Sequence, residues 1–86
     1  MQGKLSKQWV ASEISRLEGK PMTDVRTVKA WLSVYFVIAS NAPTEKASNE
    51  ALAVIERLVR IYRVTRPMLR ASQAKASSVL EVLNNE

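Results

Sequence analysis

The chain has 86 residues, of which 47% are hydrophobic, and it carries a formal net charge of +5 with no histidine and no cysteine. This length allows one core, and the apolar content is too high for a disordered chain. The missing cysteine and histidine exclude disulfides, thiol chemistry and an imidazole general base. A basic balance favours anionic partners, of which nucleic acid is the commonest.

The small number of turn-forming residues indicates the fold class. Two glycines and three prolines are too few for the many turns of a β-sandwich or β-barrel, whereas helices need few connections. We therefore expect an all-α fold, a small bundle of three or four helices forming a single helical domain over residues 1–86. The expected helices cover residues 6–18, 24–40, 45–65 and 67–84.

The first predicted helix begins at Ser6, whose side chain can cap the helix N-terminus. Gly19 is expected to adopt the left-handed conformation that ends many helices, and Pro21 prevents continuation. Helical spacing places four apolar residues on one side of this helix: Trp9, Val10, Ile14 and Leu17.

Residues 25–39 are the most apolar stretch and are expected to form the central, buried helix. Thr23 or Asp24 can provide its N-cap. The β-branched and aromatic residues 34–38 would also suit a strand, but no second strand-like segment is present to pair with them. The helical faces together predict a core of Val10, Ile14, Leu17, Val28, Leu32, Tyr35, Phe36, Ile38, Ile55, Leu58, Val59 and Tyr62.

A helix-turn-helix is an alternative interpretation of the first two helices. In that arrangement the second helix would contact DNA through Arg26, Thr27 and Lys29. The long turn after Gly19 and the expected burial of the second helix disfavour it.

An apolar stripe with 3-4 spacing runs through the C-terminal half and continues across Pro67. Its positions are Ser48, Ala51, Ile55, Leu58, Tyr62, Thr65, Leu69, Ser72, Ala76, Val79 and Leu83. The continuity leaves open whether residues 45–84 form one helix kinked at the proline or two helices. Because the stripe is long for so small a core, we predict a homodimer or larger oligomer formed through the C-terminal helix. The predicted interface residues are Ile55, Leu58, Tyr62, Leu69, Ala76, Val79 and Leu83.

Positive charge is concentrated between Glu56 and Glu81, where no acidic residue intervenes. The cations of this segment are Arg57, Arg60, Arg63, Arg66, Arg70 and Lys75. They could bind a polyanion or an acidic protein partner, or they could form only a solvated helix face. Base stacking is not expected, since Tyr62 falls on the apolar stripe, so any nucleic acid would be contacted through its phosphates.

The sequence contains no candidate for catalysis. No two carboxylates share a helix face at short spacing, and the glycines are isolated, so neither an acid–base pair nor a phosphate loop is indicated. We expect no enzyme activity, no cofactor, no metal site and no small-molecule substrate. Without a recognisable signal peptide or membrane-spanning segment, we expect a cytoplasmic protein.

Two functions are consistent with these patterns. The first is a non-catalytic helical interaction, adaptor or regulatory protein that binds protein partners and self-associates through its C-terminal helix. The second is a small basic nucleic-acid-binding protein that contacts phosphates through the arginines of residues 57–70.

Overall fold

The computed structural model describes residues 2–85, which form four α-helices and no β-strand. In chain order these are α1 (Gln2–Leu17), α2 (Val25–Ser40), α3 (Glu45–Tyr62) and α4 (Arg66–Asn84). The prediction of an all-α bundle is therefore confirmed.

The start of α1 differs from the prediction. The helix is already formed at Gln2, so Ser6 lies inside it instead of capping it, and Ser6 is buried with 3% of its surface exposed. The predicted end is confirmed, because α1 stops at Leu17 and Gly19 adopts a positive φ of 82°. A residue with a side chain would be strained in that conformation.

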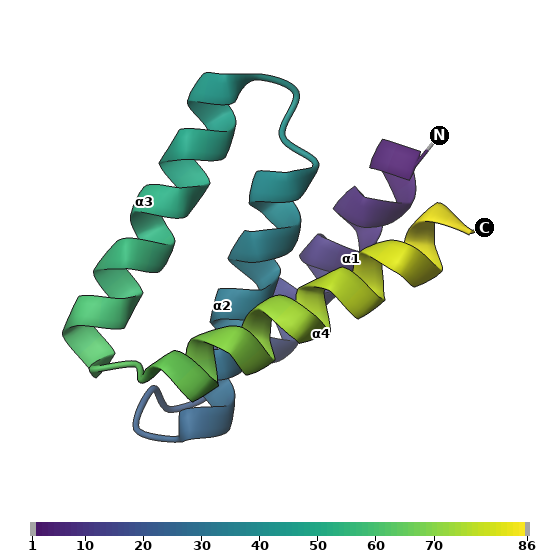
Figure 1. The fold of residues 1–86 in the computed structure, drawn as a ribbon. Coiled ribbons are helices and arrows are strands. Elements are labelled where there is room, and N and C mark those ends of the chain that lie inside the picture. Colours follow the sequence, from purple (N-terminus) through teal and green to yellow (C-terminus); the bar gives the residue numbers. More distant parts are fainter. Residues whose placement is uncertain (1, 86) are drawn as a thin grey trace.

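Helix α2 lies at the centre of the molecule and contacts each of the other three helices (Figure 1). It begins at Asp24, whose carboxylate accepts a hydrogen bond from the Arg26 backbone amide at 2.9 Å, so Asp24 and not Thr23 is the N-cap. Apolar side chains are buried around most of its circumference, including Leu32, Val34 and Val37. A helix enclosed in this way is not free to enter a DNA groove, which argues against the helix-turn-helix alternative.

The C-terminal half forms two helices. Helix α3 ends at Arg63, which has the left-handed φ of 51°, and the Val64 amide donates to the Val59 carbonyl at 3.0 Å. Pro67 occupies the first turn of α4, where its missing N–H costs no helical hydrogen bond. Figure 1 shows α3 and α4 diverging from this corner, and among residues 2–85 α3 packs on α2 alone.

The core forms where α2 meets its neighbours. Val28, Leu32 and Ile55 make a buried cluster. The partly buried side chains packed against it are Met22, Tyr35, Phe36, Leu58, Val59, Val64 and Leu69. Of the predicted core residues, Leu17, Val28, Leu32 and Ile55 are buried, and the others apart from Tyr62 are half-buried. Tyr62 is wrong, since 38% of its surface is exposed, and the fully buried Val34 and Val37 were missed.

Small residues allow α4 to approach α2 closely. Ser72 is 1% exposed and Ala76 is 3% exposed, so both face the interior of the chain instead of facing outward. The Ser33 hydroxyl lies 3.1 Å from the Ser72 carbonyl, and the Ser72 hydroxyl lies 3.3 Å from the Lys29 carbonyl. The small residues of the stripe therefore serve contact within the chain.

Candidate interaction surface

The arginines of the predicted anion-binding segment surround the corner between α3 and α4. Arg57 and Arg60 lie on α3, Arg63 lies in the corner, and Arg66 and Arg70 lie on the first turns of α4. All five side chains are exposed. The predicted stripe is thus bent at the corner instead of following one straight helix.

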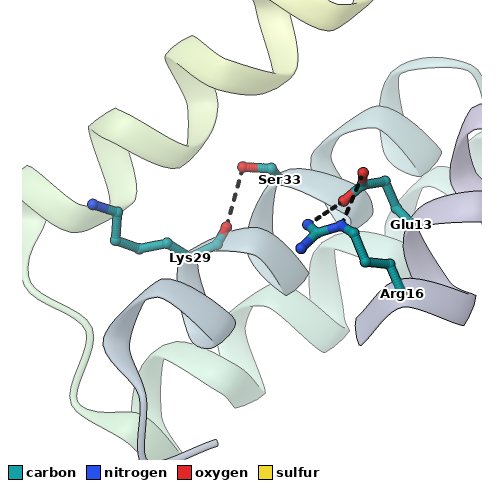
Figure 2. Close-up of polar contacts among 4 residues, drawn as sticks. All are labelled: Glu13, Arg16, Lys29 and Ser33. Atoms are coloured by element: carbon teal, nitrogen blue, oxygen red, sulfur yellow. Dashed lines mark hydrogen bonds and ion pairs between the residues drawn. The ribbon is translucent and has the colours of Figure 1, made fainter. Parts of the chain in front are cut away.

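The other two arginines of the chain are used differently. Arg16 pairs with Glu13 at 2.7 Å, as Figure 2 shows, and Arg26 pairs with Asp24 at 3.1 Å. Within residues 5–85 these are the ion pairs of the chain, so the corner arginines have no carboxylate partner there. Lys75, the sixth predicted cation, lines a separate hollow of about 180 Å³ beside Trp9 and Glu13.

Two ion pairs border a polar hollow of about 410 Å³ between the end of α1 and the start of α2. The hydrogen bond from the Arg26 guanidinium, with help from the Arg26 backbone amide, lowers the pKa of the Asp24 carboxyl below its ordinary 3.8. The carboxylates of Asp24 and Glu13 raise the pKa values of Arg26 and Arg16 respectively. Arg16, Arg26 and Asp24 are thus paired locally, whereas Lys20, which also lines the hollow, is in neither ion pair.

The structure separates the predicted oligomer interface into two groups. Ile55 and Ala76 are buried within the chain, and Leu58 and Leu69 pack against its core. The remaining positions are still accessible, namely the exposed Tyr62 and the half-buried Val79 and Leu83. The stripe therefore serves the chain's own core over much of its length.

Several apolar side chains outside the predicted interface are exposed to water. Ile61 follows Arg60 on α3 and is 60% exposed, and Val82 near the end of α4 is also 60% exposed. Leu52 and Val25 are 40% and 53% exposed. One signal was present in the sequence, because Ile61 and Val82 both fall outside the 3-4 stripe and so point away from the helix that the stripe contacts.

Two apolar hollows lie beside α2, between α1 and α3. One has a volume of about 370 Å³ and is lined by Trp31, Tyr35 and Leu58 among others. The Trp31 and Tyr35 rings are 6.4 Å apart between centroids and tilted by 31°. The other, of about 350 Å³, lies at the opposite end of α2 and is lined by Val10, Ile14 and Ile38 among others. Trp31 is thus a half-buried surface residue and not a fully enclosed core anchor.

The chain matches no protein-family model, no curated protein and no solved structure in comparisons with known proteins. Among residues 2–85, no helix is both long and apolar enough to cross a membrane. In the same part of the chain, no three acidic side chains are grouped as a metal site would require.

Proposed function

We propose that this protein is a non-catalytic helical interaction protein of the adaptor or regulatory kind, which self-associates through the second half of α4. The observation that carries this proposal is the apolar end of α4. Val82 is 60% exposed there, while Val79, Leu80 and Leu83 are half-buried. At 100° per residue these four positions span about 160° of the helix circumference, and contact with the chain's own α1 and α2 leaves Val82, at the edge of this apolar face, exposed.

A second copy of the chain is the partner that this surface fits most simply. Two copies of α4 packed across a twofold axis would cover each other's Val82, and an isologous contact needs no second protein. The half-buried Val79 and Leu83 would become fully buried in that contact, as the stripe predicts.

The substitution Val82→Glu tests this proposal with little risk to the fold, because the side chain is mostly exposed. We expect it to weaken self-association at least tenfold, since a carboxylate would be desolvated in the contact. Val25→Glu is the matched control, because Val25 is a valine of similar exposure on α2 and should leave self-association unchanged. Gel filtration with light scattering provides the measurement. Equal masses for both variants at every concentration would contradict the proposed site.

A second candidate function is binding to a polyanion through the arginines of the α3–α4 corner. It is supported by the exposure of these side chains and by their lack of carboxylate partners within residues 5–85. Arginine suits bidentate contacts to phosphates. Such binding weakens steeply as the salt concentration rises, because the release of counterions from the phosphates then contributes less free energy.

Fluorescence anisotropy with generic DNA and RNA across a salt series tests the second candidate. We expect the triple variant Arg57→Gln, Arg60→Gln and Arg70→Gln to lose binding and to flatten the salt dependence. The matched control is Lys7→Gln, Lys20→Gln and Lys46→Gln, which removes the same charge from exposed lysines elsewhere. If both triple variants lose affinity equally, net charge and not the corner is responsible.

A further inference from the structure

The apolar hollow of about 350 Å³ combines a shape and a chemistry that suit a small ligand. It lies between α1, the end of α2 and the start of α3, and Val10, Ile14 and Ile38 form its apolar wall. Its volume is at the small end of the ~300–1,000 Å³ that ligand pockets span.

Ser6 is the unusual residue of this hollow. It lines the hollow, it is 3% exposed, and its hydroxyl oxygen is buried without a hydrogen-bond partner. A buried hydroxyl without a partner is unfavourable, and serines inside helices usually donate to the carbonyl four residues earlier. The Ser6 hydroxyl has no hydrogen bond to break, so it can donate to a ligand in the hollow without losing another partner.

The polar groups around the hollow favour a ligand that accepts hydrogen bonds. Lys7, on the rim, contributes an exposed ammonium group, and no carboxylate lines the hollow. The Asn41 amide nitrogen is directed at the Val37 carbonyl at 3.4 Å. Ser6 and Lys7 thus offer the hollow a hydroxyl donor and a cation.

We propose that this hollow binds a small aliphatic carboxylate. The alkyl chain lies against Val10, Ile14 and Ile38, and a carboxylate oxygen accepts a hydrogen bond from Ser6 close to the Lys7 ammonium. The ligand is bound and not converted, since the binding requires no catalytic group. This inference is independent of self-association through α4, because none of the residues lining the hollow belongs to α4.

Titration with octanoate, followed by the methyl resonances of Val10 and Ile14, tests the proposal. We expect saturable shifts with octanoate and at least tenfold weaker binding of octylammonium, which has the same chain and the opposite charge. Equal binding of both probes, or no binding of either, would overturn the proposal. Shifts that instead follow protein dilution without any octanoate would show that a second copy fills the hollow, which also overturns it.

The variant Ser6→Ala separates binding from folding. We expect about tenfold weaker octanoate binding, with a thermal midpoint of the ligand-free protein that is unchanged or higher because an unpartnered hydroxyl is removed. Ser12→Ala, at an exposed position of α1, controls for the helix propensity of alanine and should bind octanoate normally. Unchanged affinity in Ser6→Ala would refute the assigned hydroxyl contact.

Ala11→Trp, which fills the hollow from an exposed position, should abolish binding while the far-UV circular dichroism is retained.

Discussion

The two buried serines at the contact between α2 and α4 set how close these helices lie. The Ser33 hydroxyl is 3.1 Å from the Lys29 carbonyl of its own helix, as Figure 2 shows, and 3.1 Å from the Ser72 carbonyl across the contact. The Ser72 hydroxyl is 3.0 Å from the Met68 carbonyl. Each serine hydroxyl therefore has two carbonyl acceptors within reach, one on its own helix and one across the contact, so it stays hydrogen-bonded with either. The two backbones lie too close for a larger side chain to fit between them.

We predict that Ser72→Leu lowers the free energy of unfolding by about 1–3 kcal/mol, because the added atoms overpack a closed contact. Ser77→Leu places the same side chain at an exposed position of α4 and should change stability by less than about 0.5 kcal/mol. Urea unfolding monitored by circular dichroism compares the two variants. If Ser77→Leu were as destabilising as Ser72→Leu, the close contact would not be the cause.

Asp24 links stability to pH. Its folded pKa is lowered, so its contribution is present above the unfolded pKa and is lost as the pH falls through the folded value. We predict that Asp24→Asn, which keeps a side chain able to cap α2, flattens the loss of stability on acidification. Urea unfolding at a series of pH values from neutral to strongly acidic measures this. A variant with the same acid dependence as the wild type would contradict it.

At the scale of the elements, the break between α3 and α4 is the feature that the sequence left open. The 3-4 spacing continues through it because both helices pack on α2, so each must direct its apolar residues to the same neighbour. Periodicity reports which face is buried and not whether the chain turns. The local signal for a break was weak, since the residue that adopts the left-handed conformation is Arg63 and not a glycine.

We predict that Arg63→Gly stabilises the protein by about 0.5–1 kcal/mol, because glycine adopts the left-handed conformation without strain. The same change at Arg57, inside α3, should destabilise it by about 1 kcal/mol. Chemical unfolding midpoints compare the two variants, which remove the same charge. A loss of stability in Arg63→Gly would contradict the assigned role of the corner.

The helix boundaries show where capping residues in the sequence were enough to predict the start of a helix. Capping chemistry gave Asp24 as one of two N-cap candidates for α2, and the Asp24 side chain does cap that helix. Helix α3 begins at residue 45 as predicted, and the Thr44 side chain caps it by accepting a hydrogen bond from a backbone amide. The same rule was wrong for Ser6, because a serine near the start of a pattern can also lie inside a longer helix. Val34 and Val37 were missed since helical spacing selects one face, whereas α2 is covered on several.

At the scale of the whole molecule, α2 holds the fold together. Helix α3 packs on α2 alone within residues 2–85, so removing the α2 contact surface would release α3. The apolar composition of residues 25–39 predicted that α2 would be the central helix. The directions in which α3 and α4 run depend on contacts between helices, which no local sequence pattern specifies. The arginines and the positions of Ile61 and Val82 outside the 3-4 stripe were recognisable from the sequence, whereas the extent to which the neighbouring helices leave these two side chains exposed was not.

We predict that Leu32→Ala lowers the free energy of unfolding by about 2–5 kcal/mol, because Leu32 is fully buried in the central cluster. Leu52→Ala, at a leucine 40% exposed on α3, should cost much less. Thermal unfolding followed by tryptophan fluorescence and by circular dichroism should give one coincident transition in the wild type. Separate transitions would show that α2 does not unite the helices.

Self-association is the property on which the proposed function depends, and the mass of the wild-type protein in solution tests it most directly. Light scattering or sedimentation equilibrium over a broad concentration range gives that mass. The exposed apolar end of α4 predicts a mass that rises with concentration from one chain toward two. A mass equal to one chain at every concentration would contradict self-association through α4.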